Sequence, residues 1–313
     1  MRIAILGTGG AGGYFGAQLA RGGLDVVFIA RGEHLKAIRS NGLHVETTKG
    51  EIIIQPAQVT DDPRVVGIVD AVIVGVKSWQ VSGVAALIQP MLGSDTCVVP
   101  LQNGVEASSQ LAAVLGARHV LSGVCLTISM VASPGRIRSL GETHLMKIGE
   151  MDNRPSTRVK RLQRAFEHAG VKVDVPLDIN VALWEKFLLV VSFGGVGSVT
   201  RAPIGVIRTV PETRRMLEQC MSEILAVANA RGISLSDGVV EKSMAFLDSL
   251  PEGGTTSLQR DLSNGRPSEL EALNGAVVRL GGESRVDVPL NTFIYHALLA
   301  HELKARGQKE FPT

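Results

Sequence analysis

A glycine-rich segment near the N-terminus has the spacing of a phosphate-binding loop. Residues 7–12 read G-x-G-x-x-G, follow an apolar stretch (2–6) that predicts a strand, and precede a predicted helix (13–20). In this context the first glycine permits a tight turn, the second lets the backbone approach a pyrophosphate, and the third lets helix and strand pack closely. The helix N-terminus would offer its N–H groups to the anion. A dinucleotide site is therefore predicted at Gly7, Thr8, Gly9, Gly10, Ala11 and Gly12. A glycine-rich turn of another α/β protein is the alternative.

A basic residue after the second predicted strand narrows the identity of the dinucleotide. Arg31 ends the apolar stretch 24–30, where an NAD site usually carries an Asp or Glu for the ribose 2′-OH. A guanidinium at this point could hold a 2′-phosphate through its charge and fork geometry. We therefore expect NADP(H) as the cofactor. An ordinary surface arginine remains the alternative, and Glu33 keeps NAD open.

Lys186 is the candidate for proton transfer, because a nicotinamide cofactor supplies only the hydride. It lies at the head of a nearly all-apolar predicted helix over residues 181–193. A protonated lysine can stabilise the charge that develops on a carbonyl oxygen and then donate the proton. Partial desolvation there would lower its pKa from about 10.4 toward neutral. A lysine that extends its ammonium group into water, or that pairs with Glu185, explains the sequence equally well.

Composition limits the classes of protein to which the chain can belong. The chain has 313 residues, 45% of them hydrophobic and 20% charged, which is typical of globular proteins long enough for two domains. A net charge of +2 and an aromatic content of 4% argue against a nucleic-acid partner. Cys97, Cys125 and Cys220 form no C-x-x-C pair, so we expect reduced thiols and a cytoplasmic protein.

Membrane and metal sites are not expected either. The longest uncharged apolar stretch begins at Phe187 and is interrupted by glycines at positions 194, 195 and 197, which is unlike a membrane span. His296 and His301 are five residues apart and do not share a helix face, and the other histidines are scattered. We therefore predict no membrane partner and no metal ligands.

The elements that would position these residues change in kind along the chain. In the first half, strands alternate with helices, which predicts a parallel, doubly wound α/β sheet. The predicted strands are 2–6, 24–30, 70–76, 96–101, 120–130, 136–140, 144–148 and 171–175. The predicted helices between them include 79–91, 105–115 and 157–169.

The second half is predicted to be all helical, from apolar residues spaced at 3–4 positions. Its predicted helices are 212–231, 237–249, 269–280 and 291–304. The change falls near residues 176–178. We therefore predict a dinucleotide-binding domain over residues 1–176 and a helical substrate domain over residues 177–313.

Taken together, these motifs resemble the ketopantoate reductase (2-dehydropantoate 2-reductase) family over nearly the whole chain. The family's glycine loop, 2′-phosphate arginine, K-x-W-Q lysine and N-G pair are similar to residues 7–12, Arg31, Lys77 and Asn103-Gly104. Its L-W-x-K-F, S-S-M-x-x-D and G-R-x-x-E motifs are similar to residues 183–187, 256–261 and 265–269. Several separated motifs in the same order are far more specific than any one of them.

The resemblance implies a fold and an activity. The fold would be a Rossmann domain followed by a helical domain similar to that of 6-phosphogluconate dehydrogenase. The activity would be NADPH-dependent reduction of a small-molecule 2-keto acid, with ketopantoate reduced to pantoate in pantothenate (vitamin B5 and coenzyme A) biosynthesis as the first expectation. A homodimer is one possible assembly.

The resemblance also implies roles for individual residues. Lys186 would donate the proton to the keto oxygen, and Asn103 would contact both nicotinamide and substrate. Lys77 would hold the cofactor, and Ser257 would bind the substrate carboxylate. Glu269 would orient the lysine or contact the cofactor ribose, so it is a candidate for both catalysis and cofactor binding. Without the resemblance, Ser257 would be a helix N-cap and Glu269 an acid favoured by a helix dipole.

Two positions depart from the family pattern. Asparagines are expected four and eight residues after the lysine, but Val190 and Gly194 stand there. Either Ser198 or Arg201 supplies part of the missing recognition, or the substrate is a less polar 2-keto acid. Another NADP-dependent reductase of 2-keto or 3-hydroxy acids, and a non-catalytic NADPH-binding regulator, remain the alternatives.

Overall fold

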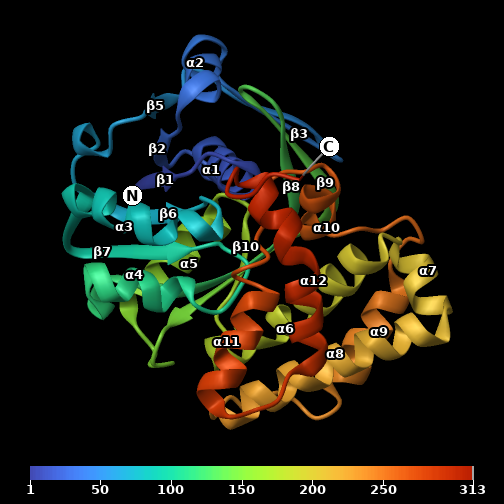
Figure 1. Ribbon diagram of the computed structural model, residues 1–313. Helices are drawn as coiled ribbons and strands as arrows, with labels where there is room; N and C mark the ends of the chain where they lie inside the picture. Colours follow the sequence, from blue (N-terminus) through green and yellow to red (C-terminus); the bar gives the residue numbers. More distant parts are fainter. Residues whose placement is uncertain (312–313) are drawn as a thin grey trace. The chain divides into compact units, whose positions relative to one another are not determined.

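Five parallel strands form the sheet that carries the glycine-rich loop (Figure 1). Their order across the sheet is β5-β2-β1-β6-β7, and each neighbouring pair is parallel. They are β1 (Arg2–Leu6), β2 (Asp25–Ile29), β5 (Gln58–Thr60), β6 (Val69–Val74) and β7 (Leu92–Pro100). These runs are rich in Val and Ile because a parallel sheet is covered on both faces. The predicted α/β class is confirmed. The computed structural model describes residues 1–311, apart from the side chains of residues 142 and 143.

Helices cover both faces of this sheet, as in a doubly wound fold. Ile3 and Ile5 of β1 face one buried core, shared with α1 (Gly10–Arg21) and α5 (Thr157–His168). Ala4 and Leu6 face the other core, shared with α3 (Val81–Ile88) and α4 (Ala107–Leu115). The alternation follows from the two-residue period of a strand. A further helix, α2 (Gly32–Asn41), follows β2 and contacts β5.

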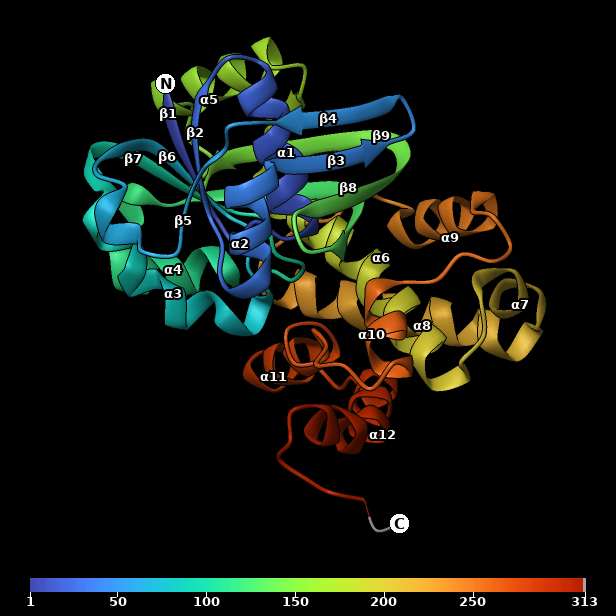
Figure 2. The ribbon, with the colours of Figure 1, turned by 90° about the horizontal axis from the view of Figure 1, so that it is seen from above.

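A second, mixed sheet packs against α1, which thus lies between two sheets (Figure 2). Its members are β3 (Leu43–Thr47), β4 (Gly50–Ile54), β8 (Leu121–Ser133), β9 (Arg136–Glu150) and β10 (Lys172–Asp174). Residues 120–148 were predicted as three strands, and that is wrong: they form the long antiparallel hairpin β8–β9. Gly141 separated the two predicted pieces, but β9 continues through it with a shift of register.

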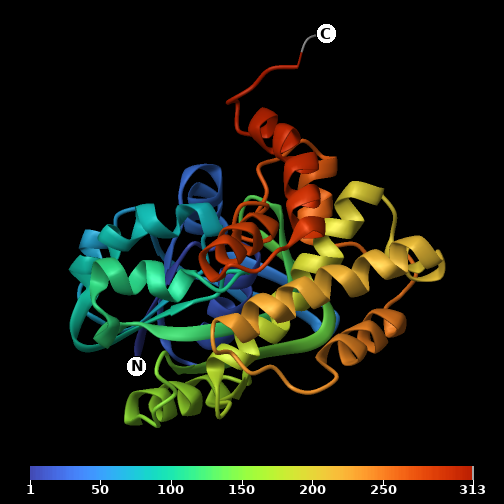
Figure 3. The same cartoon turned by 60° about the horizontal axis from the view of Figure 1, so that its bottom comes forward.

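The second half of the described chain is helical, as predicted (Figure 3, yellow-green to red). Its helices are α6 (Ile179–Thr200), α7 (Ile204–Thr209), α8 (Pro211–Ala230), α9 (Val239–Ser249), α10 (Ser257–Ser263), α11 (Asn274–Ser284) and α12 (Pro289–Ala305). Among residues 1–311, α6 alone is long and apolar enough to cross a membrane by length and composition. However, 61% of its most apolar window is buried, as in the core helix of a folded domain.

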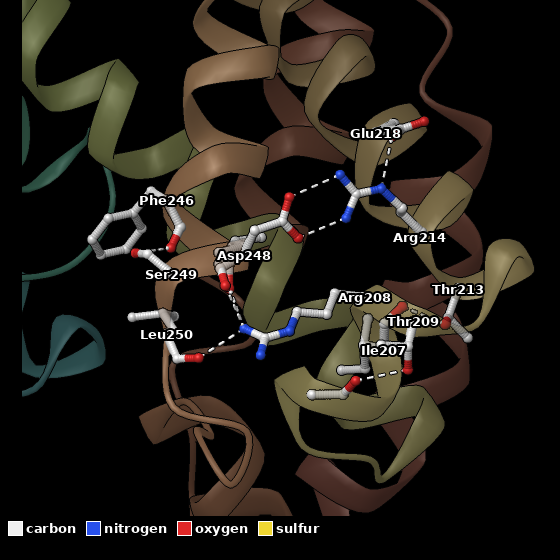
Figure 4. A network of polar contacts seen from close by, with 12 residues as sticks. Ile207, Arg208, Thr209, Thr213, Arg214, Glu218, Phe246, Asp248, Ser249 and Leu250 are labelled. Atoms are coloured by element: carbon white, nitrogen blue, oxygen red, sulfur yellow. Dashed lines mark hydrogen bonds and ion pairs between the residues drawn. The ribbon is translucent and has the colours of Figure 1, made fainter.

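A polar network holds the end of α9 against α7 and α8 (Figure 4). The Arg208 guanidinium donates to the carbonyl oxygens of Leu247, Asp248 and Leu250 at the C-terminal end of α9, where carbonyl groups lack the N–H groups of a following helical turn. Arg214 forms two hydrogen bonds with the Asp248 carboxylate, at 2.7 and 3.0 Å, and they lower the pKa of that carboxyl. Two arginines thus cap one helix.

Contacts divide the chain into two units. Unit 1 comprises residues 1–102 and 106–182, and unit 2 comprises residues 103–105 and the chain from Leu183 onward. The predicted domains were 1–176 and 177–313. The contact boundary falls inside α6, and the short segment after β7 groups with the helical unit. The roles assigned to the two domains stay predictions.

Candidate active site

The three motif glycines of the loop occupy three different environments in unit 1. Gly7 has φ of 97°, and a Cβ there would lie 2.7 Å from the Val76 backbone nitrogen. A Cβ at Gly12 would lie 2.2 Å from the Gly7 carbonyl oxygen. At Gly9 the nearest atom would be 3.8 Å away, so its surroundings are open. The first and third glycines therefore serve the turn and the packing, and the second leaves room for a ligand.

The loop presents backbone donors without protein acceptors. In the described part of the chain, the N–H groups of Gly9, Gly10, Ala11 and Gly12 find no acceptor. They lie at the start of α1, where a helix favours an anion. A Cβ at Gly10 would lie 2.2 Å from the carbonyl oxygen of Ser129 on β8. Sequence reasoning missed this purpose of Gly10, because Ser129 is distant in the chain.

Arg31 stands exposed at the end of the second strand. It is the N-cap residue of α2, and its side chain forms no hydrogen bond or ion pair with residues that the structure describes. Glu33, which left NAD as an alternative cofactor, forms an exposed ion pair with Lys36 at 2.7 Å. A guanidinium in this position is available for an anionic ligand, whereas the nearby carboxylate already has a partner.

The K-x-W-Q motif forms a short structured turn after β6. The Lys77 ammonium lies 5.7 Å from the centre of the Trp79 ring, and the Lys77 backbone N–H donates to Gln80 Oε1 at 3.2 Å. Gln102 donates to the carbonyl oxygens of Val74 and Val76 at 2.9 and 2.8 Å. Gln80 thus fixes the backbone of Lys77, whose side chain is exposed.

In unit 2, Asn103 and Glu269 meet directly although 166 positions separate them. Asn103 Nδ2 donates to Glu269 Oε2 at 3.0 Å, and the glutamate is 8% exposed. Gly104 explains the N-G pair, because its φ is 105° and a Cβ would lie 2.9 Å from the Ala272 carbonyl oxygen. Glu269 was predicted inside a helix, which is wrong: α11 begins at Asn274, and Glu269 lies in the preceding turn.

A buried ion pair contacts Ser268, the residue that precedes Glu269. Glu302 of α12 accepts from the Ser268 backbone N–H at 3.1 Å and from its hydroxyl at 2.5 Å. Arg306 donates to Glu302 at 2.6 Å and to the Ser268 carbonyl oxygen at 3.0 Å. This clamp fixes the residue before the candidate glutamate. No pattern in the sequence indicates this role of Glu302, because Glu302 and Ser268 meet only in the folded chain.

Lys186, Val190 and Gly194 lie four residues apart and share one side of α6. Lys186 is half-buried, and Glu185 accepts a hydrogen bond from Ser236 at 3.3 Å. A Cβ at Gly194 would lie 3.2 Å from Leu258 Cδ2. The side of α6 that carries the candidate lysine thus packs against the start of α10.

Ser257 is the exposed first residue of α10. Thr256, not Ser257, is the N-cap, since its hydroxyl accepts from the Gln259 N–H at 3.1 Å. The simple N-cap alternative for Ser257 is therefore wrong. The neighbouring G-R pair is structural: Gly265 follows α10 with φ of 62°, and Arg266 forms an ion pair with Asp261 at 3.0 Å.

The cysteines and other ligand types form no further centre. Cys97, Cys125 and Cys220 are free and buried, and burial raises the pKa of the Cys220 thiol to about 12. Across the residues that the structure describes, no group of three His, Cys, Asp or Glu side chains could hold a metal ion.

Comparison with known proteins extends over both units. The family described as "Ketopantoate reductase PanE/ApbA" matches residues 3–153, and its C-terminal counterpart matches residues 178–302. The 2-dehydropantoate 2-reductase of Mesorhizobium japonicum is 31% identical, over 93% of this chain and 94% of its own. A PanE/ApbA family ketopantoate reductase structure from Ralstonia eutropha JMP134 has a TM-score of 0.90, with 31% identity, covering 98% of this chain and 100% of that one. A D-mandelate dehydrogenase structure with NADH and anilino(oxo)acetate has a TM-score of 0.89, covers 98% of this chain and 100% of that one, and at 22% identity shows the fold alone.

Proposed function

The chain belongs to the ketopantoate reductase family and is an NADPH-dependent reductase of 2-keto acids, and we propose that its substrate is ketopantoate, which it reduces to pantoate in pantothenate biosynthesis. The Asn103–Glu269 hydrogen bond carries the proposal. Two residues from separate family motifs meet there in a partly buried pair, although their positions in the chain are remote. Such a pair supports a built site rather than a chance match of motifs.

The residues of unit 1 fit the cofactor. The open space at Gly9 and the N–H groups of residues 9–12 suit a pyrophosphate, and the exposed Arg31 suits a 2′-phosphate. Lys77 would add a positive charge near the ribose or phosphates. When bound, NADPH supplies the hydride that reduces the keto carbon.

The residues of unit 2 would manage the proton and the substrate. As the keto carbon gains the hydride, its oxygen gains negative charge, which the Lys186 ammonium stabilises and then neutralises by donating one proton. Asn103 would orient the keto group, and Glu269, held by Asn103, would orient Lys186 or bind the ribose. Ser257, exposed at the start of α10, would donate to the substrate carboxylate.

The substrate side favours a second candidate, a 2-keto acid without a hydroxyl group. Val190 and Gly194 have no hydrogen-bonding side chain on the side of α6 that carries Lys186, and Gly194 lies close to Leu258. Ser198 is a weak substitute, since its hydroxyl already donates to the Gly194 carbonyl oxygen at 2.7 Å. Arg201, which directly follows α6 and has φ of 54°, is exposed and could still contribute.

A substrate panel separates these candidates. NADPH oxidation is followed with ketopantoate and with branched, straight and aromatic 2-keto acids. The highest kcat/KM on ketopantoate supports the first candidate, and the highest value on an unhydroxylated acid supports the second. No turnover of any 2-keto acid, with NADPH still bound, would favour the regulator. Repetition with NADH tests Arg31, because equal efficiency with both cofactors would contradict its role.

The Lys186→Ala variant tests the general acid. We expect kcat to fall by roughly 100-fold or more, with little change in NADPH affinity, because a positioned acid typically contributes about 100- to 10,000-fold. Lys242→Ala is the matched control, since Lys242 is an exposed helical lysine of unit 2. Turnover of Lys186→Ala equal to that of the control would remove the proposed acid.

The proposed role also has consequences for location and assembly. An enzyme of pantothenate biosynthesis that uses NADPH and a small-molecule keto acid would be expected in the cytoplasm. A homodimer is one assembly that the proposal allows. Light scattering of the purified protein at micromolar concentration measures its molar mass and so tests for the dimer.

A further inference from the structure

His34 connects the glycine-rich loop to the turn of the β8–β9 hairpin. Its Nε2 lies 2.8 Å from the Thr8 carbonyl oxygen, and its Nδ1 accepts the Gly135 backbone N–H at 3.0 Å. A backbone N–H can only donate, so Nδ1 must be the acceptor. The hydrogen-bond network therefore assigns the ring proton to Nε2, which donates to Thr8. The side chain is a neutral imidazole with both nitrogens in use.

Fixing the Thr8 carbonyl fixes the direction of the next backbone N–H. In a trans peptide the C=O and N–H point in opposite directions, so the Gly9 N–H is aimed away from His34. The Thr8 hydroxyl donates to the Ile29 carbonyl oxygen at 3.2 Å, which holds the residue from its other end. The hydroxyl and the carbonyl of Thr8 thus both bind protein groups, and the Gly9 N–H has no acceptor within residues 1–311.

The same imidazole ties α2 to the loop. His34 lies three residues after Arg31, in the first turn of α2, so its hydrogen bonds also hold the helix whose N-cap residue is Arg31. We propose that His34 is a positioning residue of the cofactor site, which aims the Gly9 N–H at the pyrophosphate and sets Arg31 beside the ribose. This inference rests on the cofactor half of the proposed function.

The surroundings keep the imidazole neutral. Burial lowers the pKa of His34, and the Thr8 carbonyl opposes that shift only in part. Residues 7–13 contain no charged group, and the Glu33–Lys36 pair on α2 is exposed. Arg136, which follows Gly135, pairs with glutamates of β3 and β4. A second ring proton would remove the Gly135 hydrogen bond, because both nitrogens would then be donors.

The His34→Ala variant removes both hydrogen bonds, whereas His34→Gln can retain a donor and an acceptor on one amide. His44→Ala is the matched control, since His44 also uses both ring nitrogens, with Glu51 and the Asn41 carbonyl, but does not contact the loop. NADPH affinity is measured by calorimetry, and kcat and KM by NADPH oxidation. We expect His34→Ala to weaken NADPH binding about tenfold, as expected for one lost hydrogen bond and an unpaired carbonyl.

The pattern across variants distinguishes positioning from general stability. We expect His34→Ala to raise the KM for NADPH with kcat nearly unchanged at saturation, His34→Gln to restore most of the affinity, and His44→Ala to bind as wild type. Equal affinity of His34→Ala and wild type would overturn the inference while leaving the proposed function intact. Absence of NADPH binding by wild type would overturn the proposed function itself.

If the His34→Ala variant does not fold, a measurement on the wild-type protein still tests the inference. Nitrogen-15 NMR of the imidazole reports which ring nitrogen carries the proton, with and without NADPH. A neutral ring protonated at Nε2 in both states is expected. A ring protonated at Nδ1, or a change of tautomer when NADPH binds, would refute the positioning role.

Discussion

The clamp behind Glu269 allows a quantitative prediction about the Glu302→Ala variant. Glu302 is 3% exposed and accepts from the backbone and hydroxyl of Ser268, which is fully buried. It also accepts from Arg306 Nε at 2.6 Å. Truncation would leave the Ser268 donors without this acceptor in a place that water reaches poorly.

The expected loss follows from the burial of the pair. Removing one partner of a buried ion pair typically costs about 3–5 kcal/mol, because a charge and its hydrogen-bond partners are left uncompensated. The Arg306 side chain is 22% exposed, so water can solvate it in part and the lower end applies. We expect the free energy of unfolding to fall by about 3 kcal/mol in Glu302→Ala. Ser268→Ala, which removes only the hydroxyl, should cost about 1 kcal/mol.

Urea and thermal unfolding measure the loss, and Glu283→Ala is the matched control. Glu283 also pairs with an arginine of unit 2, Arg231, at 3.0 Å, but the two side chains are 52% and 35% exposed. An exposed pair contributes about 0–1 kcal/mol, so this variant should be nearly as stable as wild type. Since Ser268 precedes Glu269, we also expect kcat of folded Glu302→Ala to fall by about 10- to 100-fold.

One result would refute this reasoning. If Glu302→Ala and Glu283→Ala lowered the free energy of unfolding equally, burial of the Glu302 pair would not govern its contribution. Unchanged kcat in Glu302→Ala would instead show that the Ser268 clamp does not position Glu269.

Three further predictions concern unit 1. Gly10→Ala should destabilise the protein by about 2 kcal/mol or more and abolish NADPH binding, because its Cβ would lie 2.2 Å from the Ser129 carbonyl oxygen. Gly83→Ala on α3, where a Cβ meets nothing within 4 Å, should stabilise the protein by about 0.5–1 kcal/mol. Equal unfolding midpoints of Gly10→Ala and Gly83→Ala would contradict both expectations. For pH, burial lowers the pKa of His34 in the folded state, so the unfolded chain takes up the proton first. The resulting stabilisation is complete above the pKa of about 6.5 in the unfolded chain and is lost as the pH falls below that value. The melting temperature should therefore fall less between pH 7 and pH 5 in His34→Gln than in the wild-type protein. An identical fall of the melting temperature in His34→Gln and in the wild-type protein would exclude His34 as the group that titrates.

Several elements could be predicted because their signals are local. The apolar run 2–6 and the glycine spacing 7–12 predicted β1, the tight turn at Gly7 and a helix after the loop, although α1 begins at Gly10 rather than at residue 13. Helices α8, α9, α11 and α12 followed from apolar residues 3–4 positions apart, with errors of up to five residues at their ends. In contrast, α6 runs seven residues past its predicted end, and α7 and α10 were not among the predicted helices. The hairpin β8–β9 was misjudged because Gly141 has the local pattern of a chain break, whereas pairing along β8 carries the strand through it.

The candidate site was only partly predictable. Lys186 and Arg31 could be proposed because each stands at a recognisable point of a predicted helix or strand, and their roles stay predictions. Glu269 was assigned to a helix because the apolar spacing of α11 extends back over it, but the Asn103 and Ser268 contacts hold residues 268–273 in a turn. His34 was missed, although its place one turn after Arg31 is a signal that could have singled it out.

By itself the sequence determined the succession of an α/β half and a helical half, the glycine-rich turn after β1 and the basic residues suited to a phosphate. These depend on spacing along a few neighbouring residues, where backbone geometry and side-chain size act directly. Only the tertiary structure decided that Asn103 holds Glu269, that Glu302 clamps Ser268, and that His34 holds Thr8. These hydrogen bonds join positions 26 to 166 residues apart, and no local preference specifies which remote donor satisfies a buried acceptor.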